Sequence, residues 1–295
     1  MSGPLARRRP PTGLLALAVL LGIGSAVHGS AGAYTARITN SGTAATSTAT
    51  YFTCASAATA PAAGALFAYP FGESHGSVAT DITGNGNNGT YRMPGSLTYG
   101  VTDSAVCPRD HTTVMTFDGV NGYVTGPPGN NPQVFSEEIW FRTAASGYLM
   151  GFGAHPTGLD PALNGYDRQL YVSATGYLVF DVYDSAYRHV ASTAKFNDDA
   201  WHHAVATLSA AGMNLYADGT LVATDPTVTS AQCYPAGGCA GGGSSGHWRI
   251  AWDNLAGTYD VPPAFHFAGS LAYAAVYSYA LTATQVQDHY VAGLP

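Results

Sequence analysis

Two adjacent glutamates, Glu137 and Glu138, are the first candidates for an acid/base pair. Hydrolysis of a glycosidic bond needs two carboxyl groups on one sugar, about 5 Å apart when configuration is retained and further apart when it is inverted. Neighbouring residues of a strand point to opposite faces, so these two side chains cannot converge on one substrate. We therefore predict no catalytic residue, and interpret the pair as one solvated carboxylate and one at the edge of the core. A pair of distant aspartates is the alternative.

A second pair, His202 and His203, follows Trp201 and could bind a metal or transfer protons. On a strand the two rings would face opposite ways, so both cannot ligate one ion. The pair therefore does not predict a metal centre.

Aromatic and polar side chains gather in two stretches that the glycine content marks as irregular loops. Sugar recognition uses aromatic rings together with a few fixed polar groups, so these stretches are the predicted ligand site. Trp248 and Trp252 are four residues apart, and the alternative is that both are core residues of a strand. The predicted ligand-binding residues are Tyr166, Asp167, Trp248, Trp252, Asp253, Asn254 and Tyr259.

The first 33 residues predict export. Three arginines at positions 7 to 9 precede an apolar run from Leu14 to Ile23, and Ala31-Gly32-Ala33 supplies small residues for cleavage. The apolar run is about half of the ~20 residues that cross a bilayer, which favours a cleaved signal peptide over a membrane anchor. We expect an extracellular protein, secreted or associated with the cell surface, with no membrane span after cleavage.

The charge balance excludes nucleic acid as a partner. Three of the 11 lysines and arginines lie in the leader, which leaves 8 against 18 acidic residues and a net charge of −10. Phosphate backbones are bound by clustered basic residues, and no three of them cluster after the leader.

The four cysteines are predicted to form two disulfides, because exported chains meet an oxidising compartment. Three pairings are possible. Cys233 and Cys239 enclose Tyr-Pro-Ala-Gly-Gly, which is flexible enough to close on itself, and this leaves Cys54 to pair with Cys107. Zinc is the weaker alternative, since neither pair has Cys-x-x-Cys spacing.

The composition predicts an all-β protein, with 36 glycines, 17 prolines and 19 tyrosines against the single lysine Lys195. After the leader, residues 34–63 are expected to form a hairpin and a linker, and residues 64–295 one β-sandwich domain. The strongest hairpin signal is Asp218-Gly219. The expected strands are residues 65–71, 113–117, 122–125, 138–143, 169–174, 177–183, 203–208, 213–217 and 221–224.

One short helix is predicted near the C-terminus. Thr282 can cap it, with Gln285 three residues on as in a capping box, and Gly293 can end it. Val286 and Tyr290 are then expected to pack inward against one edge of the sandwich.

Several segments, in order, resemble the laminin G-like jelly rolls of the concanavalin A-like lectin/glucanase superfamily. The resemblance implies two packed antiparallel sheets; it also makes Trp201 a packing residue and one of the two histidines a hydrogen-bonding core residue. Function must still come from the site, because members include sugar-binding modules, adhesive domains and glycoside hydrolases. The segments are residues 81–90, 115–124, 135–142 with 201–206 and 215–223, and 267–277 with 280–286.

The resemblance also implies calcium as a cofactor, because related domains hold one cation with oxygen ligands from loops. Calcium takes about six to eight oxygens, which Asp81, Asn85, Asn87 and Asp118 could supply in part. Ala272, however, stands where related domains usually carry an acidic residue. The alternative is that Asp81 and the asparagines make a turn.

These observations predict a secreted, disulfide-bonded, concanavalin A-like jelly-roll sandwich that binds a glycan or a glycosylated surface without catalysis. The alternatives are an adhesive or structural module with a protein partner and, third, a glycoside hydrolase. Exposed aromatic residues around one loop rim would favour sugar, whereas a flat apolar patch or an open sheet edge would favour a protein.

Overall fold

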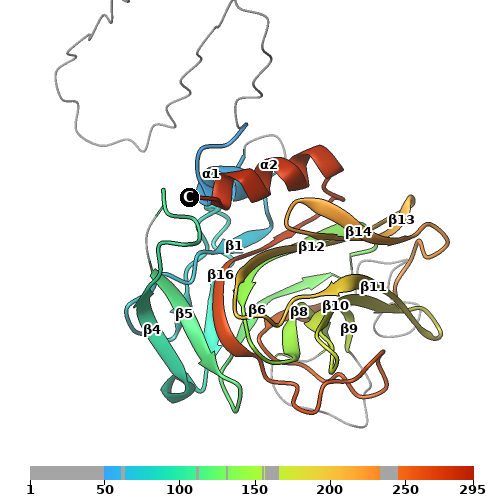
Figure 1. The fold of residues 1–295 in the computed structure, drawn as a ribbon, viewed down its shortest axis with the longest axis horizontal. Coiled ribbons are helices and arrows are strands. Elements are labelled where there is room, and N and C mark those ends of the chain that lie inside the picture. Colours follow the sequence, from blue (N-terminus) through green and yellow to red (C-terminus); the bar gives the residue numbers. More distant parts are fainter. Residues whose placement is uncertain are drawn as a thin grey trace, which may run out of the picture. The chain divides into compact units, whose positions relative to one another are not determined.

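Short strands separated by turns pair into two antiparallel sheets (Figure 1). This computed structural model describes residues 50–60, 64–110, 113–130, 132–154, 156, 166–232 and 245–295. All of them belong to one compact unit, Ala44–Pro295. The predicted signal peptide, the predicted hairpin up to residue 49, and the pair Cys233 and Cys239 lie outside the described residues.

The first sheet, sheet A, has the strand order β14-β13-β12-β7-β16-β5-β4, and β1 pairs with β16. The bounds of its strands are β1 Phe67–Tyr69, β4 Leu97–Thr102, β5 Thr113–Asp118, β7 Phe135–Arg142, β12 Trp201–Ser209, β13 Gly212–Ala217, β14 Thr220–Asp225 and β16 Ala268–Tyr277.

The second sheet, sheet B, has the order β11-β10-β9-β8-β15-β6-β3-β2. Its strands are β2 Val78–Ala79, β3 Gly89–Arg92, β6 Tyr123–Asn130, β8 Gly147–Gly153, β9 Tyr166–Val172, β10 Tyr177–Tyr183, β11 Tyr187–Lys195 and β15 Ser245–Ile250. A short 3-10 turn, η1 Pro94–Ser96, precedes β4. The predicted jelly-roll sandwich is confirmed.

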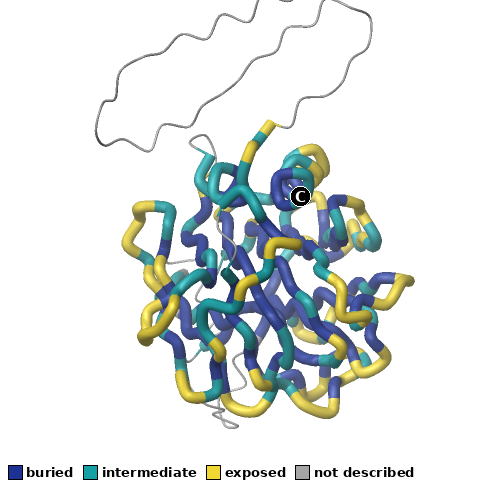
Figure 2. Tube along the Cα trace, turned by 60° about the vertical axis from the view of Figure 1, so that its left-hand side comes forward, coloured by how far each residue is buried: buried dark blue, intermediate teal, exposed yellow. Residues whose placement is uncertain are grey.

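The hydrophobic core lies between the sheets, because alternate residues of each strand point inward. On β7 these are Phe135, Ile139 and Phe141, all fully buried, and on β10 they include Phe180. Each such side chain contributes roughly 1.5–3 kcal/mol by leaving water. Figure 2 shows buried residues running along the strands, with exposed residues mainly at the turns.

Glu137 shares the inward-facing side of β7 and is buried in this core without a hydrogen-bond partner for either carboxyl oxygen. Burial raises the pKa of Glu137 well above its ordinary value, which favours the protonated form. Glu138 points to the other face and is also buried. The expectation that one of the two is solvated was therefore wrong, although their divergence on the strand was right.

The C-terminal helix, α2 Ala283–Gly293, covers part of the outer face of sheet A. Thr282 and Gln285 form the predicted capping box, and Val286 is fully buried as expected. Tyr290 is only partly buried and stacks on Trp140, with ring centroids 5.7 Å apart.

A buried polar cluster joins α2 to sheet A. His203 Nε2 lies 2.7 Å from Glu138 Oε1, and His289 Nδ1 lies 3.0 Å from Glu138 Oε2. Burial alone would raise the pKa of Glu138, but the charge of His289 and the hydrogen bonds from both histidines lower it far below its usual range. The cluster therefore pairs the Glu138 carboxylate with a charged His289, and it satisfies the expectation of one hydrogen-bonding core histidine.

A short helix, α1 Cys54–Ala58, begins at its cap Thr53, where a linker was predicted. Asp110 accepts hydrogen bonds from the backbone N–H groups of Cys54 and Ala55, which fixes the helix N-terminus and explains the departure from the linker expectation. The predicted disulfide between Cys54 and Cys107 is present. Within the described part of the chain, no helix is long and apolar enough to cross a bilayer.

Candidate functional site: an aromatic rim on sheet B

A long loop, residues 251–267, connects β15 to β16 and crosses the outer face of sheet B. In Figure 1 it is the orange-red segment below the strands. Hydrogen bonds hold it down along its length: Gln169 Nε2 donates to the Asn254 carbonyl oxygen at 2.7 Å, and Tyr171 OH donates to the Tyr259 carbonyl oxygen at 2.6 Å. This cover loop therefore has a defined position on the sheet.

Two pairs of aromatic rings lie where the cover loop reaches β10 and the edge strand β11. Tyr259 stacks on His189, with ring centroids 4.0 Å apart and planes 14° from parallel. Tyr183 meets Tyr187 edge-on at 5.2 Å. A side chain added at Gly257 would approach the Tyr187 ring to 3.4 Å, so the loop runs directly beside it. We call Tyr183, Tyr187, His189 and Tyr259 the aromatic rim.

The rim is accessible to solvent. Tyr259 is 44% exposed and His189 is also exposed, while Tyr183 and Tyr187 are partly exposed. Partial burial lowers the pKa of His189, so at neutral pH the ring is uncharged and stacks as a flat aromatic surface. Two adjacent flat rings at an accessible edge can receive the apolar face of a ligand.

Beneath the rim lies a buried carboxyl group. Asp181 is the direct cross-strand partner of His189 on one side and of Gln169 on the other. Neither Asp181 oxygen nor Gln169 Oε1 has a hydrogen-bond partner with good geometry. Burial raises the pKa of Asp181 well above its ordinary value, and the nearby Asp167 raises it further. The side chains of Asp181 and Gln169 are both completely buried, so they lie beneath the rim without facing solvent.

Two acidic side chains flank the rings at the surface. Asp184 follows Tyr183 and is exposed, and Asp260 follows Tyr259. Asp260 Oδ2 accepts hydrogen bonds from the backbone N–H of Thr175, at 3.0 Å, and from the Thr175 hydroxyl. Burial alone would raise the pKa of Asp260, but these hydrogen bonds and one from Ser173 together lower it, so the group is charged at neutral pH.

Two predicted ligand residues are buried. Asp167 is completely inaccessible and forms an ion pair with Arg168, Oδ2 to NH1, at 2.8 Å. Trp248 is 2% exposed and packs between the sheets against Phe152, with ring centroids 5.1 Å apart. Neither side chain can form part of a surface site in this conformation. Tyr166 begins β9, and its side chain lies outside the described residues.

The other predicted residues belong to the cover loop. Trp252 is buried to 8% exposure, where it stacks on His266 at 5.2 Å. Asp253 is buried and bonded to Arg249 at 2.8 Å, and burial raises its pKa to about 6 despite that arginine. Asn254 supplies its carbonyl to Gln169. Among the predicted residues of the cover loop, Tyr259 is the exposed ring, while Trp252, Asp253 and Asn254 make contacts that hold the loop on the sheet.

The predicted calcium ligands do not form an ion site in this structure. Asp81 accepts backbone N–H bonds from Ala68, Thr83 and Asn87 at 3.0–3.1 Å. The side-chain amides of Asn85 and Asn87 donate to the carbonyl oxygens of Ala65 and Leu66, just before β1. Asp118 accepts from the N–H of Val120 at 2.8 Å. Backbone N–H groups already donate to the carboxylate oxygens of Asp81 and Asp118 that a cation would need, so this set of side chains does not fit calcium.

The turn role of Asp81 predicts a stability effect that is independent of calcium. Asp81→Ala should lower the free energy of unfolding by about 1–3 kcal/mol, because three backbone N–H groups lose their acceptor. Urea unfolding in calcium and in chelator should give the same difference, and wild-type stability should not change with the ion. Calcium-dependent stabilisation that disappears in Asp81→Ala would contradict this expectation.

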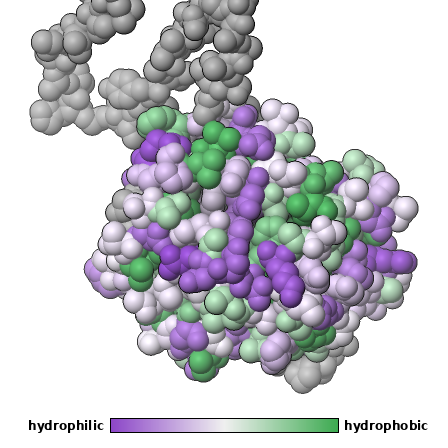
Figure 3. All heavy atoms as spheres, in the orientation of Figure 1, coloured by the Kyte–Doolittle hydropathy of each residue, from purple (hydrophilic) through white to green (hydrophobic). Residues whose placement is uncertain are grey.

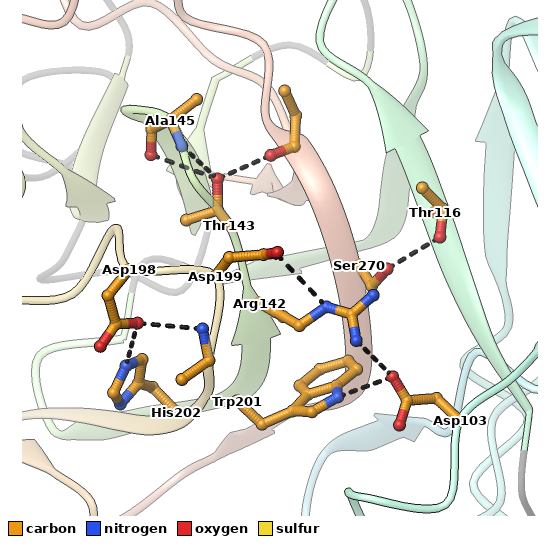
Figure 4. A network of polar contacts seen from close by, with 12 residues as sticks. Asp103, Thr116, Arg142, Thr143, Ala145, Asp198, Asp199, Trp201, His202 and Ser270 are labelled. Atoms are coloured by element: carbon orange, nitrogen blue, oxygen red, sulfur yellow. Dashed lines mark hydrogen bonds and ion pairs between the residues drawn. The ribbon is translucent and has the colours of Figure 1, made fainter.

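A second polar network lies where β7 ends and β12 begins in sheet A (Figure 4). Asp103 Oδ2 accepts from Trp201 Nε1 at 2.9 Å and pairs with Arg142 NH1 at 2.7 Å. His202 bridges Asp198 and Asp218. Figure 3 shows hydrophilic residues gathered in the middle of its view, over β12 and β16. Because these groups pair with one another, we interpret the network as structural, and Trp201 packs as the resemblance implied.

Sequence reasoning missed His189, Asp181, Tyr183 and Tyr187. They come from two strands, and what unites them is the cross-strand register that sets Asp181 opposite His189 and Tyr183 opposite Tyr187. The one available signal was the sequence Tyr-Asp-Ser-Ala-Tyr at 183–187, whose tyrosines flank a short turn.

Comparison with known proteins gives one family. A laminin G-type family model, described as the concanavalin A-like lectin/glucanases superfamily, matches residues 118–287. A search of curated proteins finds no significant match.

Solved structures with a similar fold include domain 4 of AbnA, a GH43 extracellular arabinanase from Geobacillus stearothermophilus, in complex with arabinotriose. It is 18% identical with a TM-score of 0.52, and the match covers 77% of this chain and 98% of that one. A Trypanosoma rangeli sialidase in complex with the inhibitor DANA is 14% identical with a TM-score of 0.50, and covers 82% of this chain. The match spans 35% of the sialidase, and at these identities both comparisons show the fold alone.

Proposed function

The chain belongs to the concanavalin A-like lectin/glucanases superfamily, and on that premise we propose that it is an extracellular, non-catalytic module that binds carbohydrate at the aromatic rim. The observation that carries the proposal is the exposed stack of Tyr259 on His189. Sugar rings present apolar C–H faces that pack on such rings, while their hydroxyls need fixed polar groups nearby. Asp260, held by Thr175, is such a group.

The arrangement of the carboxyl groups supports binding without hydrolysis. Glu137 and Glu138 point to opposite sides of sheet A, and Glu138 is engaged by two histidines. Asp167 and Asp253 are held in buried ion pairs with arginines. None of these four groups is available to a sugar at the surface.

A protein-binding role has less support. On the face shown in Figure 3, hydrophobic residues form separate small groups rather than one continuous patch. Large docking surfaces are usually contiguous, so this face offers none of the extent that a stable protein interface needs.

The proposal is tested by removing the exposed ring. Tyr259→Ala should weaken binding of the best neutral oligosaccharide on a glycan array about five- to thirtyfold, because a stacked ring contributes on the order of 1–2 kcal/mol. Arabinotriose is the first probe, since a domain of similar fold is known in complex with it.

Phe52→Ala is the matched control, because Phe52 is a 69% exposed ring beside α1 and lies outside the rim. It should leave binding unchanged. Equal affinity of Tyr259→Ala and the wild type, absence of any sugar binding, or release of reducing ends from a bound oligosaccharide would each count against the proposal.

A further inference from the structure

The aromatic rim carries negative charge without a compensating cation. Asp184 and Asp260 flank its rings, and within the described part of the chain neither carboxylate forms an ion pair. Burial alone would raise the pKa of Asp260, but the hydrogen bonds from Ser173 and Thr175 together lower it, so its charge persists at neutral pH. Asp184 lies just after Tyr183 at one end of β10, and Asp260 lies just after Tyr259 and bonds to Thr175 near the other end.

The basic residues on the same strands are directed elsewhere. Arg168 forms its buried ion pair with Asp167, and Arg249 forms its own with Asp253. Arg188 precedes His189 on β11, so its side chain points to the opposite face, where its charge acts on Asp225 of β14. Lys195 lies over the Tyr177 ring, at the end of β10 near the Thr175 turn that binds Asp260. Within the described residues, none of the four forms an ion pair with Asp184 or Asp260.

We propose that the rim selects uncharged sugars and rejects acidic ones such as uronic acids, sialic acids and sulfated glycans. This inference rests on the proposed carbohydrate-binding function and adds the class of sugar. Two exposed carboxylates near a bound anion should each weaken its binding roughly three- to fivefold at low salt, or about tenfold together.

The test compares matched neutral and acidic probes by isothermal titration of the full chain. The pairs are galactotriose with trigalacturonic acid, and lactose with 3′-sialyllactose. The methyl ester of trigalacturonic acid restores a neutral group at the same position. We expect at least one neutral probe to bind, its acidic counterpart to bind about tenfold more weakly, and the ester to recover most of the loss. In 0.5 M salt the preference should shrink, because the surface charges are then screened.

Charge-neutral variants separate electrostatics from shape. Asp184→Asn with Asp260→Asn keeps the size of both side chains and should reduce the tenfold preference to about twofold. The matched control, Asp118→Asn with Asp199→Asn, removes two exposed charges elsewhere and should keep the preference. If the acidic partner binds as tightly as the neutral probe, the inference fails while sugar binding stands. If neither these probes nor arabinotriose nor any sugar on the glycan array binds, the proposed function itself fails, and this inference with it.

Discussion

Arg168→Met should destabilise the protein by about 3–5 kcal/mol, because it leaves the Asp167 carboxylate buried without its charge partner. Arg168 is fully buried, stacks over the Phe152 ring at 5.3 Å, and donates from Nε to the Pro132 carbonyl oxygen. The loss is a large share of the roughly 5–15 kcal/mol that holds a domain folded. Thermal unfolding should show a decrease in Tm of roughly 10 °C.

Two comparison variants identify the cause. Arg142→Met removes an arginine of the same type from its ion pair with Asp103, but that side chain is 35% exposed, so the cost should stay below about 1 kcal/mol. Asp167→Asn added to Arg168→Met removes the buried charge and should recover part of the stability. A single Arg168→Met variant no less stable than Arg142→Met would show that the buried pair does not stabilise the fold.

The fold was predictable where local chemistry and tertiary structure agree. Asp218 and Gly219 both adopt positive φ, 49° and 76°, as a tight hairpin requires, and β13 and β14 pair across them. The capping residues Thr282 and Gln285 likewise act within four residues of each other. These signals need no knowledge of distant contacts.

The missed strands lack such local signals. β8, with the sequence Gly-Tyr-Leu-Met-Gly-Phe-Gly, has three glycines that weaken the strand pattern. Gly151 is nevertheless required, because a Cβ there would come within 2.3 Å of the Arg168 carbonyl oxygen. β11 is an edge strand with mixed exposure, so its alternation is faint. In both cases the strand depends on neighbours that the sequence does not reveal.

The candidate site was predictable only in part, for the same reason. The composition of the cover loop identified Tyr259, which is exposed, and equally Trp252 and Asp253, which are buried. An aromatic residue near glycines can face solvent or core, and only the strand register distinguishes the two. Trp248 shows this: it lies on β15, and the pairing with β8 directs its ring into the core.

The position of the cover loop links the core to the proposed site. Tyr171 on β9 packs with Tyr148 and Leu255 beneath the loop, and its hydroxyl holds the Tyr259 carbonyl oxygen. The stack of Tyr259 on His189 is therefore set by buried contacts of sheet B rather than by the loop alone. A rim preorganised in this way loses less entropy when a ligand binds.

Removing the disulfide by Cys54→Ser with Cys107→Ser should lower the free energy of unfolding by about 4 kcal/mol, on the loop-entropy estimate for a separation of 53 residues. The loss of stability should be largest where the segment around α1 contacts the end of α2. Arg109, two residues from the bridge, donates to the carbonyl oxygens of Phe52 and Ala292, and the Cys107 N–H donates to Gly293. Hydrogen exchange should therefore increase first in α1 and in the last turn of α2.

The matched comparison is Cys233→Ser with Cys239→Ser, which opens a predicted bridge across only six residues. The same relation gives about 2 kcal/mol for so short a loop, and the exchange of α1 should stay as in the wild type. Equal losses from the two double variants, or protection of α1 unchanged without the Cys54–Cys107 bridge, would show that Asp110 and Arg109 hold the N-terminal segment by themselves. The rim lies on sheet B, whereas the Cys54–Cys107 disulfide packs against residues of sheet A. Below the unfolding temperature, both double variants should therefore bind sugar with the same affinity.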